Sequence, residues 1–356
     1  MTQVTFPPDA VEQEIADFRI AEEMLSEKDP SFLRYVQQRR AAFEKNFGKE
    51  AFSDFLDKAQ RALIIAYARV ALRHGAWGDD LHHYHNEGHA VEILVGRINY
   101  LCERAGAQRL KPLDWVMLTL FAATHDLRQR EKPDIEALIG NNERASIQEA
   151  HRILTGVGFD PDTDREVFDD LEMMIAGSTF NVQPKQNPNI SPAEAASSCG
   201  ALAPMLVKEL DQNNPEWAED SALKRRVRLT LIASDLDTAN VAEPIIKYAK
   251  SAVRLCKEIE FRSGRDLDSP ESAGPVLGFL TRGQEAYFFE LHEFDSKIGN
   301  EILGPMKEAN APMLTALCDH MRKVFPDAPG PDVTGRMILD EFMHKASEIG
   351  GRVAKA

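Results

Sequence analysis

The chain has 356 residues, a formal net charge of −15, 43% hydrophobic residues and 28% charged residues. This is the composition of a soluble globular protein, and the acidic balance argues against nucleic acid as a partner, since phosphate backbones favour basic surfaces. No apolar stretch approaches the 18 residues of a membrane span, and the N-terminus lacks a basic start and an apolar signal core. The four cysteines are scattered, which favours reduced thiols in a cytoplasmic protein.

Apolar residues recur at three- and four-residue spacing along most of the chain, which predicts helices, whereas strand and hairpin signals are nearly absent. We therefore predict an all-α fold. The expected helices are 32–47, 52–73, 90–104, 113–125, 142–155, 165–175, 223–236, 244–260, 284–306, 311–324 and 333–345. Segments rich in Pro, Gly, Asn or Ser predict loops at 181–192, 266–278 and 328–331.

The segment 84–90 reads Tyr-His-Asn-Glu-Gly-His-Ala. Its two histidines, His85 and His89, are four residues apart, so on a helix they would share one face. One imidazole could then bind a metal ion while the other faces whatever the metal binds. This spacing makes the segment a candidate for a catalytic metal site.

A second pair, His125-Asp126, follows the apolar run 116–123, so a buried helix would deliver it. A buried carboxylate without a partner is costly, and a metal ion would be its partner. A further acidic residue, Asp235, follows far downstream. Imidazole nitrogen and carboxylate oxygen together suit zinc, manganese or iron and, with more oxygen and water, magnesium.

This order of residues resembles the His…His-Asp…Asp signature of the HD-domain metal-dependent phosphohydrolases. Within them, segment 84–90 resembles the signature of the class I 3′,5′-cyclic nucleotide phosphodiesterases. Segment 146–151 is similar to that family's Ser-Val-Leu-Glu-Asn-His, segment 233–236 to its Ala-Asp-Leu with one extra residue, and segment 283–288 to its Ser-Gln-x-Gly-Phe-Ile. The resemblance covers roughly residues 80 to 305.

The resemblance implies a hydrolase that converts cAMP, cGMP or both to the nucleoside 5′-monophosphate by attack of a metal-bound hydroxide. Two divalent ions would be needed, zinc at the tight site and magnesium or manganese at the second. The implied metal ligands are His89, His125, Asp126 and Asp235, with Asp126 bridging the two ions. The implied general acid is His85, which would protonate the leaving 3′ oxygen.

The remaining catalytic candidates support the metals. Glu149 would orient metal-bound water and the acid imidazole. Gln129 occupies a position where the resemblance implies a histidine bound to the bridging water. Glutamine can hydrogen-bond water but cannot take up its proton, so this departure leaves the generation of hydroxide open.

Substrate contacts are implied further along the chain. Gln284 would read the purine edge, because its amide offers both a donor and an acceptor, and Tyr287 would stack on the base. Asn240 follows the last acidic ligand, where the family places a base-contacting asparagine, with the alignment uncertain by two residues. Tyr84, next to His85, is also expected to contact the substrate.

The expected organisation is an N-terminal helical extension (1–79), an HD/PDEase-like catalytic domain (80–327), and a C-terminal loop and helix (328–356). Two alternatives remain open: an HD phosphohydrolase acting on another phosphoester, such as a nucleoside monophosphate, and a non-catalytic nucleotide-binding or sensing protein. The expected partner is a small-molecule nucleotide, with neither nucleic acid nor membrane. Monomer and homodimer both remain open.

Overall fold

The computed structural model describes residues 5–48, 52–79, 81–129, 140–179, 203–325 and 330–353, and the loop expected at 181–192 lies outside them. The described residues form helices and no strand, which confirms the predicted all-α fold. They group into two compact units. The first holds the described residues up to Thr179 and from Ala203 to Asp237, and the second holds those from Thr238 onward.

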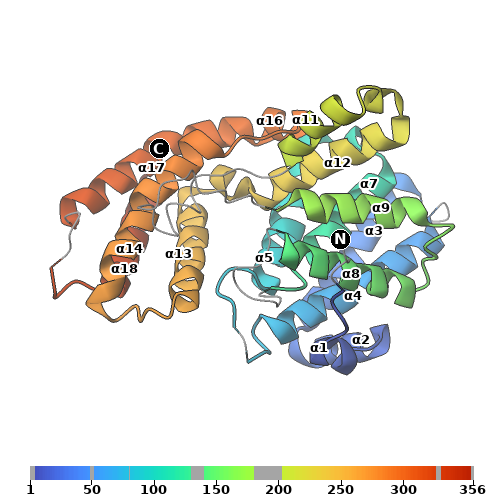
Figure 1. Cartoon of the computed structure of the whole chain (residues 1–356), viewed down its shortest axis with the longest axis horizontal. Coiled ribbons are helices and arrows are strands. Elements are labelled where there is room, and N and C mark those ends of the chain that lie inside the picture. Colours follow the sequence, from blue (N-terminus) through green and yellow to red (C-terminus); the bar gives the residue numbers. More distant parts are fainter. Residues whose placement is uncertain are drawn as a thin grey trace. The chain divides into compact units, whose positions relative to one another are not determined.

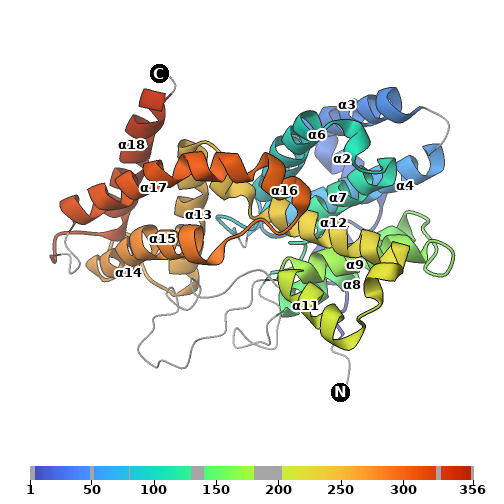
Figure 2. The same ribbon diagram turned by 90° about the horizontal axis from the view of Figure 1, so that it is seen from above.

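The first unit is a bundle of helices (Figure 1, Figure 2). Its α-helices are α1 (Ala10–Glu14), α2 (Phe18–Lys28), α3 (Pro30–Phe47), α4 (Ser53–Arg73), α5 (Glu87–Val91), α6 (Asn99–Ala105), α7 (Pro112–Thr124), α8 (Asn141–Gly156), α9 (Arg165–Gly177), α11 (Ala203–Asn213) and α12 (Ser221–Asp237). The π-helical segment η1 (Glu92–Ile98) joins α5 to α6, and the 3₁₀ turns are η2 (Ala107–Arg109) and η3 (Trp217–Glu219).

Helix α7 forms the centre of this unit. Every residue from Asp114 to Thr124 is buried, and α4, α9 and α12 pack around it. The continuous apolar run explains this placement, because a helix that is hydrophobic on all sides is stable only when surrounded. Truncating a fully buried leucine such as Leu118 to alanine would cost about 2–5 kcal/mol.

Ion pairs align α12 with α7. Asp114, in the first turn of α7, accepts hydrogen bonds from Arg225 (2.7 Å) and Arg228 (2.8 Å) near the start of α12. Both helices rise by about 1.5 Å per residue. Counted from these ion pairs, the two helices run for nearly the same length. Helix α7 reaches its end at His125, and α12 reaches its end at Asp237.

The expected helix 90–104 begins earlier than its hydrophobic pattern indicates. Asn86 caps α5, because its side-chain oxygen accepts a hydrogen bond from the Gly88 N–H (2.9 Å) and its amide donates to the His82 carbonyl (2.6 Å). Asparagine is among the preferred N-caps, so the helix starts at Glu87. The segment that follows is a π-helix. This conformation is rare in proteins, but where it occurs it is often part of a functional site.

The second unit is also entirely helical over its described residues. Its elements are η4 (Ala239–Ala242), α13 (Ile245–Arg262), η5 (Pro270–Ser272), α14 (Ala273–Gly278), the π-helical η6 (Phe279–Gly283), α15 (Gln284–Ala286), the π-helical η7 (Tyr287–Leu291), α16 (Lys297–Ile302), α17 (Gly304–Val324) and α18 (Gly335–Val353). Helix α18 packs against α13, α14 and α17, around a core that includes Leu280, Leu317 and Phe342.

Two expectations for this unit are wrong. The helix expected at 284–306 is interrupted from His292 to Ser296, because His292 adopts an extended conformation and Ser296 caps a new helix by accepting from the Gly299 N–H. The loop expected at 266–278 contains the helix α14. Its serine, proline and glycine residues suggested a loop, but Ala273, Val276 and Leu277 are buried in the core.

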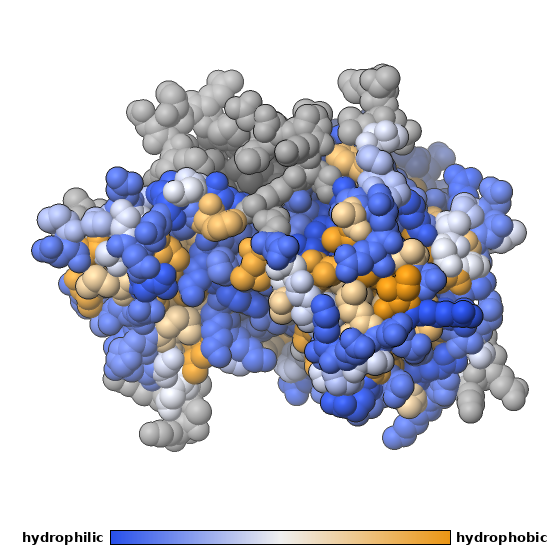
Figure 3. All heavy atoms as spheres, turned by 90° about the horizontal axis from the view of Figure 1, so that it is seen from below, coloured by the Kyte–Doolittle hydropathy of each residue, from blue (hydrophilic) through white to orange (hydrophobic). Residues whose placement is uncertain are grey.

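The units also divide the chain differently from the expected domains. Residues of the segment 1–79 belong to the same unit as segment 84–90 and His125. The residues expected to contact a base, from Asn240 onward, belong to the second unit. Among the described residues, no helix is both long and apolar enough to cross a bilayer. Figure 3 shows one face, on which hydrophilic side chains predominate and hydrophobic ones lie in patches between them.

Candidate metal centre

Three elements of the first unit bring histidine and aspartate side chains together. His89 lies on α5, and His125 and Asp126 directly follow α7. One potential ligand atom from each of these residues lies within 4.8 Å of the other two. Asp237, at the end of α12, completes the group: its Oδ1 is 2.9 Å from His89 Nε2 and 3.5 Å from His125 Nε2.

Several buried atoms of this group lack a hydrogen-bond partner. They include His125 Nε2 and Asp126 Oδ2, which are 3.2 Å apart. Such orphaned polar atoms are uncommon in folded proteins and indicate a missing ion or water. Two imidazoles and two carboxylates are a donor set that fits a divalent transition metal.

The orientation of His125 also suits metal binding. Its Nδ1 lies 3.2 Å from the Phe121 carbonyl oxygen, and a carbonyl can only accept, so Nδ1 carries the hydrogen in the neutral ring. The lone pair is therefore on Nε2, which faces Asp126 and Asp237. A hydrogen bond from the other ring nitrogen to a carbonyl is the usual support of a metal-binding histidine.

The charges of the group are strongly coupled. Burial opposes protonation of His125, but the carboxylates of Asp126 and Asp237 outweigh it and raise the pKa of this imidazole well above its usual value. Burial likewise favours the protonated form of both carboxyls, and the nearby histidines overcome it and lower the pKa of Asp126 and of Asp237. The site therefore holds ionised carboxylates at neutral pH, as metal binding requires.

The acidic residue beside the histidines is Asp237, two positions beyond the predicted ligand Asp235. Two residues turn an α-helix by about 200°, so the two side chains lie on roughly opposite faces of α12. Asp235 is buried at 2% exposure. Asp237 is therefore a ligand candidate that the sequence prediction did not include, and the assignment of Asp235 as the last ligand stays a prediction.

Tyr84 and His85 line the same region. The Tyr84 ring packs against His89 with the ring centroids 4.6 Å apart, and the His85 ring is 6.3 Å from that of His89. His85 is half-buried, and its charge contributes to the low pKa of Asp126. The role of His85 as the general acid stays a prediction.

Gln129 contacts the metal centre through Asp126. Its amide donates a hydrogen bond to Asp126 Oδ1 (2.9 Å), and its carbonyl oxygen accepts one from Asn142 Nδ2 (3.1 Å). The glutamine thus fixes the orientation of the carboxylate and leaves Asp126 Oδ2 for another partner. In this structure Gln129 is a positioning residue, a role that the sequence prediction did not include.

The structure places Glu149 apart from the histidines, in contrast to the prediction that it orients the acid imidazole. Its side chain is fully buried among Arg69, Arg73 and Arg128, at distances of 3.1–3.6 Å. Burial raises the pKa of Glu149 to about 7, and the arginines offset only part of this effect. On α8, Glu149 instead lies against these arginines.

Arg97 is a further residue of the site that the sequence prediction missed. It is 3% exposed, and its guanidinium donates to the carbonyl oxygens of Leu236 (2.9 Å) and Asp237 (2.5 Å). These bonds hold the end of α12 against η1, which begins three residues after His89. No motif marked Arg97, although an arginine within the hydrophobic pattern of 90–104 needs a buried acceptor and could have been noted on that ground.

The predicted base contacts lie in the second unit. Gln284 is buried, and its side-chain oxygen accepts a hydrogen bond from the Tyr248 hydroxyl (2.7 Å). The Tyr287 ring packs edge-on to His292, and the Asn240 side-chain oxygen accepts from the Val241 N–H (3.0 Å). Their role in base recognition stays a prediction.

The chain matches no known family model, and a search of curated proteins found no significant match.

Proposed function

We propose that this protein is a metal-dependent phosphoester hydrolase and, within that class, a phosphodiesterase that opens a 3′,5′-cyclic nucleotide such as cAMP or cGMP. The observation that carries the proposal is the grouping of His89, His125 and Asp126 within 4.8 Å. His89 comes from α5 and the other two residues follow α7, and all three present buried atoms without hydrogen-bond partners. Such atoms are uncommon in folded proteins, and a bound ion would supply their partner.

Each residue has a defined task in this proposal. A divalent ion bound here would act as a Lewis acid on a phosphoryl oxygen and would lower the pKa of water. His89, His125, Asp126 and Asp237 would hold the ion, and Gln129 keeps the Asp126 carboxylate oriented. The four side chains offer ligands for one ion, and a second ion remains a prediction from the sequence.

The narrower proposal depends on segment 84–90. Asn86 caps α5 and so fixes His85 just outside the helix while His89 lies inside it. This geometry supports His85 as the group that donates a proton to the leaving 3′ oxygen of a cyclic phosphodiester. The same arrangement supports the broader class, in which the substrate is another phosphoester.

The test is a turnover assay of the purified, metal-stripped protein after addition of Zn²⁺, Mn²⁺ or Mg²⁺. The substrates are cAMP, cGMP, AMP and bis-nitrophenyl phosphate, and the variant is Asp126→Asn. The matched control is Asp162→Asn, an exposed carboxylate.

Metal-dependent cleavage of a cyclic nucleotide that Asp126→Asn abolishes and Asp162→Asn retains would support the full proposal. Cleavage of AMP alone would leave only the broader class. Binding of a nucleotide without metal-dependent turnover of any substrate would contradict the enzyme assignment and favour a sensing protein.

A further inference from the structure

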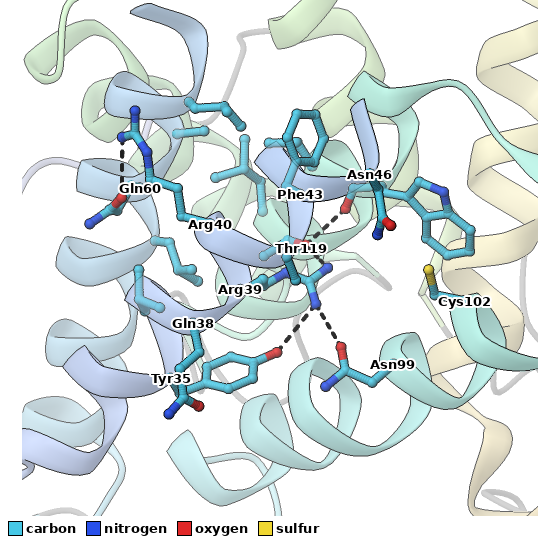
Figure 4. A pocket seen from close by; sticks show the side chains of 18 of the residues that line it. Tyr35, Gln38, Arg39, Arg40, Phe43, Asn46, Gln60, Asn99, Cys102 and Thr119 are labelled. Atoms are coloured by element: carbon cyan, nitrogen blue, oxygen red, sulfur yellow. Dashed lines mark hydrogen bonds between the residues drawn. The ribbon is translucent and has the colours of Figure 1, made fainter. Parts of the chain in front are cut away.

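A separate cavity of about 520 Å³ lies in the first unit, between α3, α4, α6 and α7 (Figure 4). Its walls are mainly apolar and include Val36, Phe43, Leu63 and Trp115. Gln38, Ala42 and Asn46 also line it and are exposed, so the cavity reaches solvent along α3. Cavities of about 300–1,000 Å³ with apolar walls and a few polar groups are typical binding sites for small molecules.

Three charged residues line this cavity: Arg40, the exposed Glu103 and Arg39. In the part of the chain that the structure describes, Arg39 is the one cation of the three that has no carboxylate partner. Its guanidinium donates to the Tyr35 hydroxyl (3.3 Å), the Asn99 side-chain oxygen (2.9 Å) and the Thr119 hydroxyl, as Figure 4 shows. All three acceptors are neutral. Among the described residues, no carboxylate forms an ion pair with Arg39, and its Nε donates to no acceptor.

The neighbouring arginine, Arg40, differs from Arg39 in having acidic partners. Arg40 also lines the cavity but is paired with Glu44 at 2.8 Å and with Asp57. Arg39 is half-buried, and its three hydrogen bonds to neutral acceptors leave its positive charge without a counter-charge. An anion in the cavity would supply that counter-charge. A guanidinium is suited to a carboxylate, which can accept two parallel N–H bonds from it.

We propose that this cavity binds a small organic carboxylate with an apolar body, with the carboxylate on Arg39 and the body against Phe43, Leu63 and Trp115. The exposed residues along α3 give access from solvent. Cys102, a half-buried residue on α6, also lines the cavity and offers a reporter of occupancy. This site uses none of the residues of the candidate metal centre.

Decanoate is the probe, used below its micellar concentration and measured by titration calorimetry on the full chain. Decanol tests the need for the charge, and inorganic phosphate tests the need for the apolar body. The variants are Arg39→Gln and, as a matched control, Arg34→Gln, an exposed arginine of α3 outside the cavity lining. Their folding is checked by circular dichroism.

We expect decanoate to bind more tightly than decanol and phosphate. Arg39→Gln should weaken the binding of decanoate about 10- to 150-fold, the effect of losing a hydrogen bond to a charged group, and Arg34→Gln should leave the affinity nearly unchanged. No binding of decanoate, equal binding of decanol or phosphate, or equal loss in the two variants would overturn the proposal.

A second measurement does not require a variant. Alkylation of Cys102, followed by mass spectrometry of its own peptide, should slow as decanoate fills the cavity. The buried Cys256 and Cys318 serve as references in the same sample. An alkylation rate of Cys102 that saturating decanoate does not change would contradict binding at this site, even if Arg39→Gln failed to fold.

Discussion

The choice between Asp237 and Asp235 as the acidic ligand leads to the sharpest prediction. Asp237→Asn keeps the size of the side chain and removes the charge that lies 2.9 Å from His89 Nε2 and 3.5 Å from His125 Nε2. We expect this variant to lose metal, whereas Asp235→Asn should bind metal as the wild type does. The fold should persist in Asp237→Asn, because its side chain remains 15% exposed.

The magnitude follows from the position of the carboxylate. Removing a residue that only supports a metal ligand costs about 10- to 100-fold in metal affinity. Loss of a carboxylate that lies beside both imidazoles should therefore lower the metal affinity at least about 100-fold, which is about 2.7 kcal/mol of binding free energy.

The assay is titration calorimetry of the metal-stripped protein with Zn²⁺ and Mn²⁺. Because the carboxylates raise the pKa of His125, wild-type binding should release protons at neutral pH and tighten as the pH rises. The buffer dependence of the enthalpy reports this release, which should shrink in Asp237→Asn. Equal metal affinity of Asp237→Asn and the wild type, or loss of metal only in Asp235→Asn, would refute the geometry of the site.

Three further predictions test the surroundings. His85→Ala should slow hydrolysis of a cyclic nucleotide about 10²–10⁴-fold but affect a nitrophenyl ester much less, since that leaving group needs no proton; equal losses in kcat would exclude His85 as the acid. Arg97→Met should weaken metal binding about 10- to 100-fold by freeing the Asp237 carbonyl, and unchanged calorimetry would contradict this. Asp9→Asn should lower the free energy of unfolding by about 1–2 kcal/mol at pH 7. Although burial opposes it, Arg73 lowers the pKa of Asp9 from 3.8 to about 2. This contribution to the free energy of unfolding is present above pH 3.8 and is lost as the pH falls through 2. The free energies of unfolding in urea of Asp9→Asn and of the wild type should therefore converge near pH 2.

The sequence predicted the class of fold and most helices because both depend on a local signal. Apolar periodicity marked the helix around Leu118, and the expected bounds 113–125 differ little from those of α7. The break at His292 was missed because hydrophobic residues continue on both sides of it. Its cause is the cap at Ser296, and a serine within a helical pattern is a weak signal.

The sequence predicted the candidate site well where one residue can fill a position and left it open where two aspartates compete for the same position. His89, His125 and Asp126 stand in unique positions, and the structure brings them together. The segment after residue 233 offers two aspartates on opposite faces of α12, and sequence alone does not give the rotation of that helix. The rotation is set by distant contacts, such as the pairing of Asp114 with the start of α12.

Distant contacts also explain why the segment 1–79, expected to be a separate cap, belongs to the unit of the metal centre. Arg73 donates to the carbonyl of Leu127, the residue after the His125-Asp126 pair, and to Glu149. The single carboxylate of Glu149 cannot neutralise all the buried arginines around it. Glu12 supplies a second negative charge, because it pairs with Arg128 at 3.0 Å. A buried charge that loses its partner is strongly destabilising. Arg73 therefore holds the backbone next to the His125-Asp126 pair, and part of the negative charge that balances the buried arginines comes from helix α1.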